Sequence, residues 1–130
     1  MNNNNKPIRE LTKAEDQIMQ ILWQLKTAFV KDVIEKLPSP KPAYNTVSTI
    51  IRILEKKGFV SFKAYGKTHE YFPIIEKDEY SNYYLKSFVN RYFKGSFQDL
   101  VSFFAKENKL NITEMEEMIK RVESDLEKGD

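Results

Sequence analysis

The stretch that decides the fold runs from residue 42 to residue 73 and reads PAYNTVSTIIRILEKKGFVSFKAYGKTHEYFP. Its first part predicts a helix over 44–57, because apolar side chains recur at helical spacing and a glycine follows. Its second part predicts an antiparallel hairpin, since two aromatic and β-branched runs, 59–64 and 70–74, flank a turn at Gly66. The apolar stripe of the predicted helix consists of Val47, Ile50, Ile51 and Leu54.

Two shorter helices are predicted upstream of this stretch. Thr12 and Glu15 form the pattern of a capping box, so the first helix should begin there and run to about Leu25. Thr27 should cap the second helix, which Pro38 would end because proline has no amide to donate. The apolar positions at helical spacing are Ala14, Ile18, Ile21, Leu22 and Leu25 in the first helix and Val30, Val33, Ile34 and Leu37 in the second.

Three helices followed by a hairpin are typical of a winged helix-turn-helix, a mainly α fold with a small β-hairpin wing. The polar side chains of the third helix that face away from its apolar stripe are Asn45, Thr49, Arg52 and Lys56, with Ser48 beside them. In the DNA major groove, Asn and Arg bond adenine and guanine edges, and Thr and Ser reach bases or phosphates. The residues expected to read bases are Asn45, Ser48, Thr49 and Arg52.

Side chains around this face are candidates for contacts with phosphates, which position a protein without specifying sequence. The main candidates are Tyr44, Thr46, Lys56, Lys63 and Lys67, and further lysines near them are Lys31, Lys41 and Lys57. Residues 1–77 carry 13 Lys and Arg against 8 Asp and Glu, whereas residues 78–130 carry 8 against 11. A basic front half agrees with binding to a polyanion such as double-stranded DNA.

Two other interpretations of the polar helix face stay open. It could be an ordinary solvated surface, because most exposed polar helix faces are. It could also belong to a winged helix that binds a protein, in which case the protein would bind its partner independently of salt and would not bind duplex DNA. The charge distribution and the hairpin favour DNA over both.

The composition argues against an enzyme, a cofactor and a membrane span. The chain has no cysteine, and a metal site at its single histidine, His69, would need carboxylates alone beside it. No apolar run approaches the roughly 18 residues that cross a bilayer, and the polar start of the chain lacks the apolar segment of a signal peptide. We therefore expect a cytoplasmic protein without catalytic residues, metal or cofactor.

The chain is expected to divide near residue 76, into a winged-helix domain (1–76, with 1–9 as a flexible tail) and a helical dimerisation domain (77–130). Nine of its 17 aromatic residues lie between Tyr80 and Phe104, a large apolar load for a free monomer. The residues expected at a homodimer interface are Tyr84, Phe88, Tyr92, Phe93, Leu100, Phe104, Met115, Met118, Ile119 and Val122. Two alternatives stay open: these helices pack on the winged-helix domain, or they enclose a small ligand.

Short motifs follow one another in a specific order and spacing from Leu11 to about Leu126. They are 11–15, 18–23, 45–52, Leu54 with 56–58, 66–67, 71–73, 92–96 and 110–111. In these motifs the chain resembles the penicillinase repressors, the BlaI/MecI/CopY group of bacterial regulators.

The resemblance implies a winged-helix transcriptional repressor that dimerises through its C-terminal helices on a palindromic operator. It also implies a partner, a membrane-bound metalloprotease sensor whose activation leads to cleavage of the repressor within the dimerisation region. The Asn-Phe bond that is cut in the penicillinase repressors aligns with Phe103–Phe104 here, so this bond is the candidate cleavage site although its asparagine is missing.

Three departures from the family pattern are informative. The copper-responsive branch has a C-terminal cysteine cluster, and the lack of cysteine argues against copper sensing. The family often opens its reading helix with Trp-Ser-Pro, where this chain has 42–44, and loss of the serine cap costs on the order of 1 kcal/mol. The family often has basic residues at the positions of Asn45, Ser48 and Ile53, and threonine at that of Arg52. The operator sequence therefore cannot be transferred from relatives.

Overall fold

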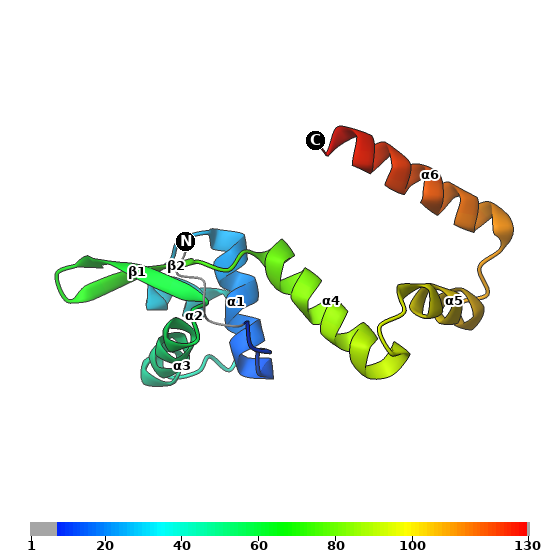
Figure 1. Ribbon diagram of the computed structural model, residues 1–130. Coiled ribbons are helices and arrows are strands. Elements are labelled where there is room, and N and C mark those ends of the chain that lie inside the picture. Colours follow the sequence, from blue (N-terminus) through cyan, green and yellow to red (C-terminus); the bar gives the residue numbers. More distant parts are fainter. Residues whose placement is uncertain (1–7, 130) are drawn as a thin grey trace. The chain divides into compact units, whose positions relative to one another are not determined.

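The computed structural model describes residues 8–129, so the expected tail at 1–9 lies almost wholly outside the described residues. Within them, the fold is mainly helical with a two-stranded antiparallel sheet (Figure 1), which confirms the predicted class. The chain forms two compact units, the first ending at Leu85 and the second beginning at Lys86. The elements in order are α1 (Lys13–Leu25), α2 (Val30–Lys36), α3 (Tyr44–Lys56), β1 (Val60–Tyr65), β2 (Thr68–Pro73), α4 (Lys77–Phe93), α5 (Phe97–Glu107) and α6 (Ile112–Lys128).

Helix α1 begins at the capping box that the sequence predicts. The amide of Glu15 donates to Thr12 Oγ1 over 3.2 Å, and the amide of Thr12 donates to Glu15 Oε1 over 2.9 Å. Two of the free amides at the helix start are therefore satisfied. The expected place of Ala14 in the buried stripe is wrong, because Ala14 is exposed and Met19 is fully buried.

The start of α2 differs from the prediction that Thr27 caps it. Residues just before the helix are extended, and Ala28 forms an antiparallel bridge with Tyr71 through amide–carbonyl bonds of 2.9 and 2.8 Å. The helix therefore starts after Phe29, whose amide donates to Asp32 Oδ2 over 3.0 Å. Thr27 is displaced from the cap because the chain first pairs with the distant strand β2.

Helix α3 is called the reading helix below, after the role that the sequence predicts for it. It begins at Tyr44 after Ala43, and no side chain caps its first amides, as the sequence predicts. Val47, Ile51 and Leu54 are fully or almost fully buried, which confirms most of the predicted stripe, whereas Ile50 is only partly buried.

The hairpin of β1 and β2, called the wing below, follows the reading helix after a short turn. Its strands pair in register from Val60 opposite Pro73 to Tyr65 opposite Thr68. Gly66 has a φ of 64°, a left-handed conformation that favours glycine, and this explains the tight turn. Burial falls along β1 from its start to its end, so the far part of the wing extends beyond the helices (Figure 1).

The core of the first unit takes in the first turn of α4. The Tyr80 hydroxyl accepts a bond of 2.8 Å from the amide of Leu11, and its buried ring lies 5.6 Å from that of Phe59 and 6.1 Å from that of Trp23. The Trp23 indole donates to the carbonyl of Ile75 over 2.9 Å. Trp23 is thus partly buried and packs against the core, and burial raises the pKa of Tyr80. The boundary predicted near residue 76 stays a prediction, but Tyr80 packs with the winged helix.

A buried ion pair joins the start of α1 to the end of the reading helix. Lys57 Nζ lies 2.6 Å from Glu15 Oε1, and the two side chains are only 16% and 7% exposed. Burial opposes ionisation of Glu15, but the bonds from Lys57 and Thr12 outweigh it, and the pKa of the carboxyl is lowered below 4.5. This contact ties the reading helix to the capping box of α1.

The second unit contains the rest of α4 with α5 and α6. Ser96 caps α5, since its hydroxyl accepts from the amide of Asp99 over 3.0 Å, and Asn111 caps α6 in a capping box with Glu114. Neither α5 nor α6 has a buried residue. No helix among the described residues is both long and apolar enough to cross a bilayer.

We predict that Glu15→Gln destabilises the protein by about 1–3 kcal/mol at neutral pH, because it leaves a mostly buried ammonium without its counter-charge. The lowered pKa of Glu15 means that this contribution is present above the unfolded pKa of 4.5 and is lost as the pH falls through the folded value. Urea unfolding of parent and variant at several pH values measures the difference. Glu114→Gln, which changes an exposed capping glutamate of α6, is the control. A difference independent of pH between 7 and 3 would contradict the prediction.

Candidate nucleic-acid interface

The outward face of the reading helix carries the polar side chains that the sequence predicts. Asn45, Thr49, Arg52 and Lys56 are all exposed and recur at the spacing of one helix face. The opposite face of the helix is buried in the core and holds it in place, so these four side chains face solvent. This arrangement allows the helix to enter a DNA groove without unpacking.

The structure places Ser48 differently from the expectation that it lies on this exposed face. Ser48 is 7% exposed, and its hydroxyl accepts a hydrogen bond of 3.0 Å from Arg52 Nη2, one turn further along the helix. Ser48 is therefore less accessible than the exposed side chains of α3. Its hydroxyl contacts the guanidinium of Arg52, which is exposed.

The start of the reading helix adds two exposed side chains that were expected at phosphates. Tyr44 is 55% exposed and Thr46 is exposed as well. No side-chain oxygen caps the first amides of α3, where the positive end of the helix dipole lies. The positive dipole end and the two hydroxyl groups are therefore on the same end of the helix.

The wing places a second group of basic side chains on the first unit. Lys63 and Lys67 are exposed near its tip, and Lys63 Nζ lies 5.4 Å from the ring centroid of Tyr65. Tyr65 is 49% exposed and packs on one side against Phe29, with ring centroids 6.0 Å apart. No role is predicted for Tyr65 from the sequence. Lys63 and Tyr65 are two residues apart on β1, so their side chains lie on the same face of the strand, and this spacing is the signal for their contact.

Two lysines proposed for phosphates are engaged in the protein instead. Lys57 is the partner of Glu15 in the buried ion pair. Lys41 Nζ donates to the carbonyls of Glu35 and Leu37, both over 2.7 Å, and so satisfies the end of α2. Lys31 and Lys56 are exposed. Of the lysines expected at phosphates, Lys41 and Lys57 thus have polar partners within the protein.

The reading helix and the wing meet at Tyr71 of β2. Burial raises the pKa of Tyr71, the charge of Glu55 raises it further, and the charge of Arg52 lowers it. These effects show that Tyr71 lies within electrostatic range of side chains on α3, while its backbone pairs with Ala28. The bridge therefore fixes β2 to the segment that precedes α2.

His69 has a packing role on the wing. Its ring stacks on Phe62, with centroids 4.0 Å apart and an angle of 9° between the planes. Among residues 8–129, no group of three or more His, Cys, Asp or Glu side chains could hold a metal ion. The wing histidine is thus part of an aromatic stack with Phe62 and Tyr71.

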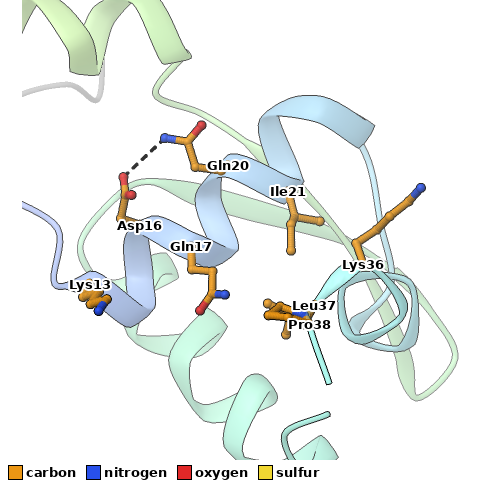
Figure 2. A pocket seen from close by; sticks show the side chains of 8 residues that line it. All are labelled: Lys13, Asp16, Gln17, Gln20, Ile21, Lys36, Leu37 and Pro38. Carbon is orange, nitrogen blue, oxygen red and sulfur yellow. Dashed lines mark hydrogen bonds between the residues drawn. The ribbon is translucent and has the colours of Figure 1, made fainter. Parts of the chain in front are cut away.

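A cleft of about 450 Å³ lies between α1 and the end of α2 (Figure 2). Its polar lining includes an exposed bond from Gln20 Nε2 to Asp16 Oδ1 of 3.4 Å, drawn as a dashed line in Figure 2. Lys13 and Lys36 lie at its border, and Ile21 and Leu37 form its floor. The lining residues offer no nucleophile paired with a base, so the cleft has no arrangement for catalysis.

The side chains expected at a homodimer interface expose much apolar surface. Tyr84 of the first unit is 47% exposed. In the second unit, Tyr92, Phe104, Met118, Ile119 and Val122 are 48–62% exposed, and Phe88, Phe93, Leu100 and Met115 are partly buried. Contacts within that unit are mainly aromatic, such as Phe88–Tyr92 at 5.0 Å and Phe93–Phe103 at 5.6 Å between centroids. Phe103 and Phe104, the candidate cleavage bond, are 54% and 50% exposed on α5.

Comparison with known proteins connects this geometry to a family. The family described as Penicillinase repressor matches residues 11–124. The methicillin resistance regulatory protein MecI of Staphylococcus aureus is 33% identical over 110 residues, which cover 84% of this chain and 89% of MecI. The penicillinase repressor of Bacillus licheniformis is 28% identical over 123 residues, which cover 91% of this chain and 93% of that repressor.

A solved structure supports the same assignment for the first unit. The solution structure of the DNA-binding domain of the repressor BlaI matches with a TM-score of 0.50 and 26% identity, covering 58% of this chain and 93% of that domain. The resemblance predicted from the sequence motifs is thereby confirmed. The chain belongs to the penicillinase repressor family, and it is a winged-helix DNA-binding repressor rather than an enzyme.

Proposed function

We propose that the chain acts in the cytoplasm as a homodimer that represses transcription from a palindromic operator. The observation that carries this proposal is the exposed polar face of α3. The opposite face of the helix is buried in the core, and a wing with exposed lysines follows it in the chain. Two copies would place two reading helices on two half-sites, separated by one DNA turn or a multiple of it.

Base reading is assigned to Asn45, Thr49 and Arg52 of the reading helix. All three are exposed on one face, and their side chains have the donors and acceptors that base edges in the major groove pair with. Arg52 offers the most specific contact, because a guanidinium can donate two parallel bonds to guanine O6 and N7. Ser48 takes part through Arg52 and not by direct contact.

Contacts with the DNA phosphates, which position the protein on the duplex, are assigned to both ends of the reading helix and to the wing. The residues proposed to contact phosphates are Tyr44, Thr46, Lys56, Lys63 and Lys67. Lys63 and Lys67 reach furthest from the core, since they lie in the exposed part of the wing. Contacts of this kind add affinity on any sequence and make binding depend on salt.

The dimer is assigned to the helices of the second unit. Exposed apolar surface of this extent is unusual for a free monomer and marks an interaction site. On α6, Ile119, Val122 and Leu126 are 58%, 55% and 68% exposed and recur every three to four residues, which makes one apolar helix face. A second copy presenting the same face would cover it.

Release is proposed to involve a membrane-bound metalloprotease sensor and cleavage at Phe103–Phe104. The bond lies in α5, a helix without a buried residue, so little packing opposes its local unfolding. The bond would have to leave its helical conformation to be cut. The second candidate mechanism is a ligand that acts without proteolysis, and it is favoured by an apolar cleft of about 530 Å³ lined by Phe97, Val101 and Met115.

We predict that Arg52→Ala weakens binding to the cognate operator by about 1–3 kcal/mol and relaxes discrimination at one base pair of each half-site. Fluorescence anisotropy with the operator, obtained by genomic footprinting of the purified protein, measures both effects. Arg121→Ala is the matched control, because it removes an arginine that is exposed on α6. Unchanged operator affinity in Arg52→Ala would refute the assignment.

We predict that Lys67→Ala weakens binding to every duplex alike and reduces the slope of log K against log salt by about 0.9, the value for one phosphate contact. Titrations at four salt concentrations, with the operator and an unrelated duplex, provide the slopes. Lys120→Ala on α6 removes the same charge away from the wing and should keep the parent slope. A loss confined to the operator would assign Lys67 to base reading.

We predict that the intact chain is a dimer at micromolar concentration and that Ile119→Glu shifts it to monomer, because a carboxylate enters the apolar face of α6. Sedimentation velocity measures the masses, with Lys120→Glu as the control at the neighbouring polar position. A chain truncated after Leu85, which keeps Tyr80 in its core, should be monomeric and bind the operator poorly. A monomeric intact chain would rule out the proposed dimer.

A further inference from the structure

Ser48 carries a buried hydroxyl on α3, whereas Asn45, Thr49, Arg52 and Lys56 of the same helix are exposed. It is 7% exposed, and α1 and α2 both contact the helix that carries it. Its hydroxyl accepts a bond of 3.0 Å from Arg52 Nη2. The partner guanidinium belongs to an exposed residue on the proposed base-reading face, so the bond connects the packed side of α3 with its outward side.

This bond leaves the guanidinium able to recognise a base. A guanidinium has five N–H donors, and the bond to Ser48 occupies one of the two on Nη2. The other proton of Nη2 remains with a neighbouring N–H, so one complete two-proton edge stays available for guanine O6 and N7. The contact with Ser48 therefore restricts Arg52 without using its recognition edge.

Restricting Arg52 before DNA arrives has a physical benefit. A free arginine side chain samples many rotamers, and ordering it at an interface opposes binding. Ser48 is on the same helix one turn earlier, and its own position is fixed by burial. The guanidinium of Arg52 is thus held near one orientation by the hydroxyl of a buried residue.

We propose that Ser48 is a positioning residue that aims the Arg52 guanidinium at a guanine, so that preference for a G·C pair at one position of each half-site depends on the Ser48 hydroxyl. This inference rests on the proposed function of α3 as the base-reading helix. It names the base that the helix face prefers at that position.

The test uses the intact chain and a pool of random-sequence duplexes. Selection with the parent protein gives a preferred duplex, and affinities for all its single-base variants give a preference at each position. The same measurements are made on Ser48→Ala, Arg52→Ala and the double variant. Ser87→Ala is a matched control, because Ser87 accepts an equivalent bond of 3.4 Å from Arg91 Nη2 on α4, away from the reading helix.

We expect Arg52→Ala to abolish a guanine preference at one position. Ser48→Ala should reduce that same preference by about threefold to tenfold, the effect of one hydrogen bond, and leave the other positions unchanged. In the Arg52→Ala background the Ser48 change should have no further effect on base preference, since the two residues act as one unit. Ser87→Ala should retain the parent preferences.

Three results would overturn the inference while leaving base reading by α3 intact. They are an unchanged preference profile in Ser48→Ala, an equal loss on every duplex, and a Ser48 effect of the same size with and without Arg52. Failure of the parent protein to enrich any sequence from the pool would instead overturn the proposed function, and the inference with it.

Discussion

The carboxylate of Glu15 is the contact on which the reading helix depends. One oxygen, Oε1, accepts both the amide of Thr12 and the ammonium of Lys57. The same atom thus closes the start of α1 and holds the last turn of α3. The chain turns at Gly58 immediately afterwards, and the amide of Phe59 donates to the carbonyl of Leu54 over 2.9 Å before β1 begins. The end of the reading helix is therefore held by Glu15, and the start of the wing is held by the bond from Phe59 to Leu54.

Local features of the fold could be predicted from the sequence, and features that join distant segments could not. Apolar spacing, the capping box at Thr12 and the turn at Gly66 depend on neighbours in sequence, and the structure confirms the box, the turn and most of the apolar positions, Ala14 being the exception. Thr27 does not cap α2, because the next residue, Ala28, pairs with Tyr71 of β2 and the helix begins later. The engagement of Lys57 depends on a carboxylate 42 residues away, and Tyr80 contacts an amide 69 residues away. Periodicity carries no information on such pairs.

The two units differ in how complete their packing is. In the first, the large residues of the core, such as Met19, Leu22, Leu54 and Phe59, are fully buried, and among its described residues no buried side-chain polar atom is without a partner. In the second, helices that are well capped at their starts leave large apolar side chains in solvent. Local signals predict these helices, but α5 and α6 lack the buried apolar face that stabilises most helices in proteins. This contrast is consistent with a DNA-binding unit that folds by itself and a second unit that is completed by association.

The attachment of the wing has a consequence for how the protein can diversify. The hairpin is fixed at its base by the bridge between Ala28 and Tyr71, whereas an added Cβ at Gly66 would meet no atom within 4 Å. Side chains of the exposed residues beside Gly66, such as Lys67, can therefore be exchanged without steric conflict with the core, whereas the φ of 64° still favours glycine at the turn itself. Under the proposed function, a change of charge at these positions would alter contacts with the sugar–phosphate backbone. The side chains of α3 that are proposed to read bases would stay the same, because they belong to a different element.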